Sequence, residues 1–155
     1  MSDFLKYLCV LGISMLPVVE LRGAVPIGIG AFELPIIPVL IVSIIGNIIP
    51  APFIILFIRK VFEWMKNKSQ RLARLAEKME ERGKEKGSMI VKYETLGLFI
   101  LVAIPLPGTG AWTGALVAAM MDLRLKNALP AIALGVIAAG TIMGIFSKFF
   151  FGVEL

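Results

Sequence analysis

Apolar residues run through this chain in long uncharged stretches and do not alternate with polar ones. Residues 36–58 and 95–121 carry no charged side chain at all. Stretches of this length indicate segments that lie in a lipid bilayer. A transmembrane β-barrel would need strands in which apolar and polar residues alternate, so these stretches must be helices. The pattern therefore predicts an all-α membrane protein.

The composition leads to the same class of protein. Of the 155 residues, 58% are hydrophobic and 17% are charged, which is too little polar surface for a water-soluble domain. We expect a single membrane domain over residues 1–155. Residues 4–19 resemble the apolar core of a secretory signal, but no basic residue precedes them and Pro17 and Glu20 interrupt the run, so we expect them to remain part of the protein.

The chain holds one cysteine, Cys9, and no histidine. A lone cysteine excludes an intramolecular disulfide, and the missing histidines argue against a zinc site or a histidine-based catalytic group. The sequence offers no nucleophile with a nearby base and no nucleotide-binding loop. We therefore expect neither an enzyme nor a bound cofactor.

The basic residues gather in one segment. Residues 59–94 carry eleven of the sixteen lysines and arginines and six of the eleven acidic residues, so the whole net charge of +5 lies there. The positive-inside rule places such a short segment in the cytoplasm, and the chain is then a multi-pass protein of the cell (inner or plasma) membrane. Acidic residues dilute the basic patch and no nucleic-acid-binding motif accompanies it, so no nucleic-acid partner is expected.

Within this segment, residues 59–82 follow a broken apolar stripe typical of a helix. Gly83 and Gly87 are expected to end that helix. One interpretation is a solvated helical linker between two membrane halves. The alternative is an amphipathic element that lies on anionic lipid, held by its basic face and by Phe62 and Trp64.

The basic segment separates two hydrophobic halves that repeat one plan. Each half has a stretch broken by proline and glycine, at residues 4–33 and 95–121, followed by a clean span, at residues 36–58 and 127–147. A straight crossing needs about 20 residues. Residues 4–33 are therefore long for one crossing and short for two.

A re-entrant hairpin, in which two short helices dip into the membrane and return to the same side, fits each broken stretch. Irregular backbone at membrane depth must be buried in protein or line a wet cavity. One hairpin and one span per half give two halves of inverted topology, an arrangement that puts a transporter's binding site near the midplane. The alternative for the first stretch is one long, tilted and kinked helix.

Glu20 and Arg22 are the most informative residues, because they flank the break in the first stretch. A charge near the bilayer centre costs about 2.5–3.5 kcal/mol on insertion scales, so such residues usually face a cavity or a partner. They could simply pair with each other or reach the interface. In the functional interpretation, Glu20 is a desolvated carboxylate that exchanges a proton for a substrate, and Arg22 binds an anionic head group or holds the Glu20 charge.

The second stretch offers a complementary site. Thr109 and the backbone amides around Gly108 and Gly110 could hold an anion at the start of a half-helix. Asn47 needs hydrogen-bond partners inside its span, either on another helix or at the site, and Trp112 could pack against the opposite hairpin or cap a cavity. The candidate substrate- or proton-binding residues are Glu20, Arg22, Gly23, Pro26, Asn47, Pro107, Gly108, Thr109, Gly110 and Trp112.

Residues 17–26 (PVVELRGAVP) and 105–114 (PLPGTGAWTG) resemble the signatures of the small multidrug export protein family, which is often grouped with the DedA/VTT superfamily. The resemblance covers nearly the whole chain. It implies two re-entrant hairpins packed against transmembrane helices, in a superfamily associated with lipid scrambling and with proton-coupled recycling of polyprenyl-phosphate lipids. The arginine-rich stretch typical of the second half of DedA proteins has no clear counterpart here, because residues 95–121 are uncharged.

We expect a membrane transporter or lipid translocase with a site between the hairpin tips, which moves an anionic lipid or amphiphile and could be coupled to protons. The alternatives are a small-molecule (multidrug) exporter, with Glu20 as the counter-charge of a cation, and a non-transporting protein that organises the membrane through residues 59–92. Membrane lipids and a second copy of the chain are the expected partners, since one copy encloses little interior. Small residues that would allow a close dimer contact are Gly135, Ala138, Ala139 and Gly140.

Overall fold

The computed structural model describes residues 2–88, 94–106 and 108–152. These residues fold into helices, with no strand among them, which confirms the all-α prediction. In chain order the helices are α1 (Asp3–Met15), α2 (Glu20–Pro26), the π-helix η1 (Ile27–Ala31), α3 (Ile36–Ile48), α4 (Pro50–Lys68), α5 (Gln70–Ser88), α6 (Glu94–Ala103), α7 (Ala111–Met120) and α8 (Leu125–Phe151).

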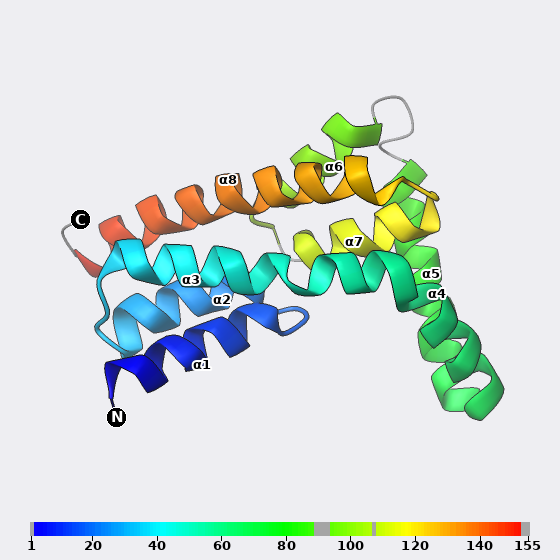
Figure 1. Ribbon diagram of the computed structural model, residues 1–155, viewed down its shortest axis with the longest axis horizontal. Coiled ribbons are helices and arrows are strands. Elements are labelled where there is room, and N and C mark those ends of the chain that lie inside the picture. Colours follow the sequence, from blue (N-terminus) through cyan, green and yellow to red (C-terminus); the bar gives the residue numbers. More distant parts are fainter. Residues whose placement is uncertain (1, 89–93, 107, 153–155) are drawn as a thin grey trace.

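The first broken stretch forms a pair of antiparallel helices. α1 ends at Met15, the chain reverses over residues 16–19, and α2 with η1 returns along α1 (Figure 1). Lys6 Nζ donates to the Phe32 carbonyl at 3.1 Å and joins the open ends of the pair. One long kinked helix therefore does not describe these residues, because the direction of the chain reverses.

α3 and α4 together form the long apolar element of the first half. Only Ile49 separates them, and Pro50, which lacks a backbone N–H, begins α4. The combined helix runs over 33 residues to Lys68, beyond the predicted end at residue 58. Its first part packs on α1 and α2, and its last part leaves the bundle (Figure 1).

The second broken stretch also forms an antiparallel pair, of α6 and α7, which residues 104–110 join. α8 follows this pair and packs on α6, α7 and α3. Its 27 residues span about 40 Å at the usual helical rise. That length exceeds the hydrocarbon thickness of a bilayer, about 30 Å.

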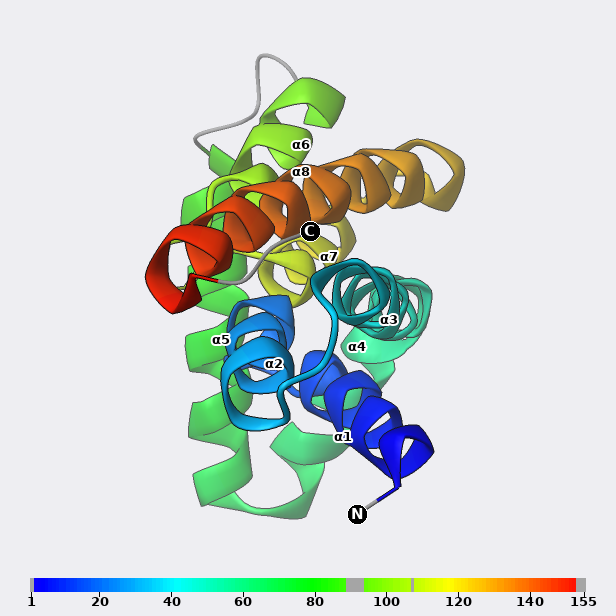
Figure 2. The ribbon, with the colours of Figure 1, turned by 90° about the vertical axis from the view of Figure 1, so that its left-hand side faces the viewer.

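The basic segment forms the end of α4 and the whole of α5, and α5 packs against α4 and α7. In Figure 2, α5 lies across the direction of α1, α2 and α3. Lys66 and Glu80 join α4 to α5 by an ion pair of 2.8 Å. A solvated linker is therefore an incomplete description, because one face of α5 is part of the folded bundle.

The prediction that Gly83 ends the linker helix is wrong, because α5 continues past it, while Gly87 lies one residue before Ser88, the last residue of α5. Both glycines are buried against the α7 region. A Cβ at Gly83 would lie 2.9 Å from Met120 Cγ, and one at Gly87 would lie 2.9 Å from Met121 Sδ. Their role is to let the backbone of α5 approach its neighbour closely.

Large apolar side chains cover the outside of the two longest helices. In their most apolar parts, only 33% of the residues of Ile36–Lys68 and 39% of those of Leu125–Phe151 are buried within the protein. A water-soluble protein rarely exposes apolar patches of this extent. Both helices are long and apolar enough to cross a bilayer, and the chain is a membrane protein.

The predicted dimer contact on the last span is wrong, because its glycines are buried within one copy. A Cβ at Gly135 would lie 2.7 Å from Val102 Cβ on α6, and one at Gly140 would lie 3.1 Å from Ile44 Cδ1 on α3. These small residues therefore serve packing inside the protomer. Dimerisation itself stays a prediction.

Replacing Gly135 by leucine should lower the free energy of unfolding by about 2 kcal/mol, since the new side chain meets Val102 and the Phe99 carbonyl. Gly12→Leu is the matched control on α1, because no atom lies within 4 Å of an added Cβ there. It should leave the stability unchanged or slightly higher. Thermal unfolding in detergent micelles measures the difference, and equal melting temperatures would contradict the packing of α6 on α8.

Candidate functional site

The turns of the two helix pairs meet inside the bundle. We call residues 16–20 the first tip, and residues 104–106 and 108–112 the second tip. The Trp112 backbone N–H donates to Glu20 Oε1 at 3.0 Å, and the Trp112 indole N–H donates to the Met15 carbonyl at 3.0 Å. One residue of the second tip thus bonds both to the buried acid and to the end of α1.

Glu20 acts as the N-terminal cap of α7, although it lies on the other helix pair. Gly110, the residue before α7, has no side chain to cap the helix, and the Glu20 carboxylate faces the amides of Ala111 and Trp112. A carboxylate is favoured there because the first N–H groups of a helix lack partners within it and carry partial positive charge. Glu20 is only 3% exposed, so these amides replace water around its charge.

Gly110 makes room for that carboxylate. Its φ of +120° lies in a region that favours glycine, and a Cβ on it would lie 2.0 Å from Glu20 Oε2. The sequence predicted that the amides around Gly108 and Gly110 could hold the anion of a ligand. In this structure the anion at the start of α7 is the protein's own Glu20.

Arg22, which lies in α2 two residues after the first tip, makes a second connection to the second tip. Its guanidinium donates to the Leu106 carbonyl, to the Ile104 carbonyl at 3.2 Å and to Thr109 Oγ1 at 2.7 Å. The single hydroxyl proton of Thr109 can serve either of the same two carbonyls, both 2.7 Å away. Arg22 is therefore a clamp between the tips, a role that suits a planar group with several donors.

Buried polar side chains continue from Glu20 along the contact of α1 with α3. Asn47 lies beside the Glu20 carboxylate and is 3% exposed. Its Oδ1 and the Ser43 Oγ have no hydrogen-bond partner among the described residues, while Ser14 Oγ donates to the Ser43 carbonyl. Buried polar atoms without a partner are uncommon in folded proteins, and Asn47 and Ser43 do not line the cavity described below. In the described part of the chain, no three acidic or cysteine side chains come together as a metal site.

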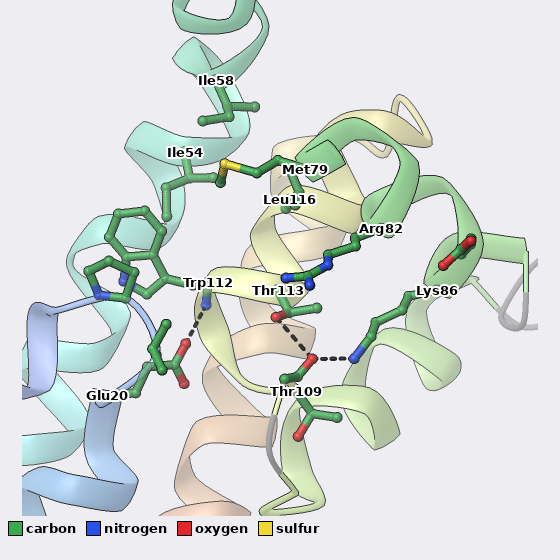
Figure 3. Close-up of a pocket in the computed structure, with 14 residues that line it drawn as sticks. Glu20, Ile54, Ile58, Met79, Arg82, Lys86, Thr109, Trp112, Thr113 and Leu116 are labelled. Atoms are coloured by element: carbon green, nitrogen blue, oxygen red, sulfur yellow. Dashed lines mark hydrogen bonds between the residues drawn. The ribbon is translucent and has the colours of Figure 1, made fainter. Parts of the chain in front are cut away.

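A cavity of about 490 Å³ lies beside the contact of Glu20 with Trp112, between the tips, α4 and α5 (Figure 3). Apolar side chains from α4, α5 and α7 form one part of its wall, and charged or polar groups from the tips and α5 form the other. The lining residues are Pro17, Val18, Glu20, Ile54, Ile58, Met79, Arg82, Glu85, Lys86, Gly108, Thr109, Trp112, Thr113 and Leu116.

Most of the predicted site residues come together around this cavity. Those that line it are Glu20, Gly108, Thr109 and Trp112. Those that contact the lining residues from outside the cavity are Arg22, Asn47 and Gly110. Gly23 instead faces Val19, whose Cγ1 would lie 2.3 Å from an added Cβ, and Pro26 ends α2. Pro107 lies outside the described residues.

The contribution of α5 was not predicted. Arg82, Glu85 and Lys86 reach the cavity, and Lys86 Nζ donates to a carbonyl of the second tip. A signal was present, because Arg82 and Lys86 are four residues apart and lie on one helix face. Gly83 and Gly87 have the same spacing of four residues on a neighbouring face of α5. Two glycines with this spacing on one face of a helix indicate that another helix packs closely there.

The first tip holds two residues in a strained backbone conformation. Val18 has φ +75° and Glu20 has φ +49°, in the left-handed region that a β-branched residue seldom enters. Such conformations cost about 1–3 kcal/mol each and cluster at functional sites. Val18 is 93% exposed, so the compensating free energy must come from the contacts of Glu20 and Arg22.

The long apolar helices and the cavity between the two tips define a helical membrane protein with a cavity beside its buried acid. Among known families, residues 20–142 of the 155 match one described as "Putative small multi-drug export protein". The chain belongs to this family. The matched range holds all the candidate site residues and the whole of α5. No curated protein and no solved structure matches the chain.

Gly110→Ala should destabilise the protein more than Gly108→Ala. Both glycines have positive φ, +120° and +78°, so an alanine at either is strained. The strain is larger at Gly110, because φ +120° with ψ −173° is a conformation that essentially only glycine adopts. Only the Gly110 variant also meets the Glu20 carboxylate, and we expect an excess loss of about 2 kcal/mol in unfolding experiments in micelles. In a Glu20→Ala background the excess should shrink to the difference in backbone strain, and an unchanged excess would show that the tip contact does not contribute to it.

Proposed function

We propose that the protein is a transporter that carries an anionic lipid or another anionic amphiphile through the cavity between the two tips. The observation that carries this proposal is the buried Glu20 carboxylate in the wall of a 490 Å³ cavity with one apolar and one charged side. A cavity of this size suits a small ligand, and its two kinds of wall suit an apolar tail and a charged head. The name of the family favours transport over catalysis.

The arrangement of the helices supports re-entrant hairpins in two inverted halves. The start of α1, the connection into α3 and the end of α8 lie at one end of the molecule, and the connection of α7 to α8 lies at the other (Figure 1). α1 packs on α3 as α6 packs on α8. Each pair would enter the membrane and return to its own side, with the tips inside the membrane. α5 would lie at the cytoplasmic face, where Lys86 reaches into the bundle to the second tip.

Proton binding at Glu20 would change the charge of the site. The charged residues of the lining are Glu20, Arg82, Glu85 and Lys86. Two acids balance two bases when all are ionised, and protonation of Glu20 leaves a net charge of +1. The start of α7 then loses its anion as well, so the cavity attracts an anionic head group. Arg22 acts on Glu20 by its charge and Asn47 lies beside the carboxylate, and proton and anion would enter together.

Export of a small cationic amphiphile is the second candidate function. Glu20 and Glu85 could provide the counter-charge, Trp112 could offer a ring face to the cation, and the family name speaks of multi-drug export. Arg82 and Lys86 in the same cavity oppose a cation, which is why we favour an anion. A non-transporting organiser of the membrane would depend on the exposed basic faces of α4 and α5 and would not need the cavity.

Transport should depend on the ionisable group of Glu20. We expect proteoliposomes with the native protein to move a polyprenyl phosphate or a phospholipid between leaflets faster than empty liposomes, under a pH gradient. Glu20→Gln keeps the shape of the side chain and an acceptor for the Trp112 N–H, but it cannot exchange a proton. Its lipid movement should fall to the level of empty liposomes and lose its response to pH.

Glu33→Gln is the matched control, because Glu33 also has a positive φ, +52°, but is exposed and does not line the cavity. It should transport as the native protein does. Lipid movement no faster than in empty liposomes would refute the lipid proposal, and uptake of a cationic dye that Glu20→Gln abolishes would then support the second candidate. Normal transport by Glu20→Gln would contradict only the proposed role of Glu20, and not the proposal of lipid transport.

The re-entrant arrangement predicts which residues share a side of the membrane. After Cys9→Ser removes the native thiol, Ser2→Cys and Glu33→Cys should react with an impermeant maleimide from outside. Lys84→Cys and Lys126→Cys should react from the cytoplasm. Labelling of intact cells and of inside-out vesicles measures the two sides, and a single crossing by either broken stretch would put its two ends on opposite sides.

A further inference from the structure

We propose that Arg82 and Lys86 of α5 bind the anionic head group of the transported molecule, and that Arg22 does not. This inference rests on the proposed transport of an anionic amphiphile, and it assigns the recognition of charge to the segment between the two halves. The head group expected is a phosphate or a carboxylate, which lysine and arginine bind by charge-assisted hydrogen bonds.

The donors of Arg22 are engaged with the protein itself. Arg22 bonds two carbonyls and the Thr109 hydroxyl of the second tip, and it does not line the cavity. An anion could take these donors only by breaking the bonds that hold the tips together. Arg22 therefore positions the tips and leaves the anion to other cations.

Arg82 and Lys86 reach the cavity from one face of α5 (Figure 3). Because they are four residues apart, both can meet one head group. Lys86 uses one of its three N–H donors on the Gly108 carbonyl, so two remain for a ligand. The ion pairs formed by the described residues do not include Arg82, whose guanidinium points toward Thr113 in the cavity (Figure 3).

Close packing holds α5 where these two side chains can act. Gly83 and Gly87 follow Arg82 and Lys86 directly in the sequence and press α5 against the α7 region. The ion pair of Lys66 with Glu80 ties α5 to α4 from another side. The two cations are thus carried by a fixed helix, which keeps their separation suited to one compact head group.

The rest of the lining suits the other parts of an amphiphile. Ile54, Ile58 and Leu116 supply an apolar wall for an alkyl chain. Glu85 also lines the cavity, so the cations of α5 exceed its acid by one charge. That balance favours a single phosphate or carboxylate over a head group with several charges.

Binding of dodecyl phosphate in dodecyl maltoside micelles tests the inference without requiring transport. The chain has two tryptophans, and Trp64→Phe leaves Trp112, which lines the cavity, as the only one. The fluorescence of Trp112 then reports occupancy of the cavity. Full-length protein with this substitution is the reference for all variants.

Arg82→Gln combined with Lys86→Gln should weaken the binding of dodecyl phosphate by about tenfold or more, because both charged contacts are lost. Arg74→Gln combined with Lys84→Gln removes the same charge from exposed positions of α5 that do not line the cavity. This matched control should bind as the reference does. Dodecyltrimethylammonium should bind no more weakly to the first double variant than to the reference.

Equal affinity of the two double variants for dodecyl phosphate would overturn the inference, as would the absence of saturable binding to the reference protein. An equal loss of affinity for dodecyltrimethylammonium would overturn it too, since recognition of charge would not be the cause. Intact binding in a protein that transports no lipid would contradict the proposed function alone. Intact transport together with unchanged binding in the Arg82 and Lys86 variant would contradict this inference alone.

Discussion

The contact between Glu20 and the start of α7 is the constraint on which the rest of the structure depends. A buried carboxylate needs donors, and the first amides of a buried helix need an acceptor. Glu20 comes from the first helix pair and the amides come from the second, so each half supplies what the other lacks. Arg22 repeats this exchange with the opposite polarity, because its donors serve carbonyls of the second tip. The meeting of the two tips, and the cavity beside it, follow from these complementary needs.

The contact of Glu20 with the start of α7 also helps to maintain the strained backbone of the first tip. Val18 and Glu20 are held in left-handed conformations that only surrounding interactions can maintain. The attraction between an ionised Glu20 and the start of α7 is one of them. A proton on Glu20 weakens that attraction, so the same event that changes the charge of the cavity also releases part of the force that holds the tip. Charge and shape are thus coupled at one residue.

Much of the fold could be predicted because the signals for it are local. The lengths of the apolar runs and the proline and glycine breaks in residues 4–33 and 95–121 indicate short helices with a reversal between them. Glu20 and Arg22 were found because charges in an apolar stretch are costly. The partner of each charged residue could not be predicted, because it lies far away in the sequence. Arg22 bonds carbonyls that the second tip leaves exposed, and the role of Gly83 in α5 depends on where α7 lies, so neither could be inferred from neighbouring residues.

α5 packs on the second tip and on α7, and no helix in the described part of the chain does the same for the first pair from the opposite end. A site made only from two similar, inverted halves would look alike from both faces of the membrane. Under the proposed topology, α5 breaks that equivalence, because a molecule coming from its side meets cations first and one coming from the other side meets the two packed tips. The connection between the halves would thereby make the two faces of the site chemically different, although the two halves that form it are similar.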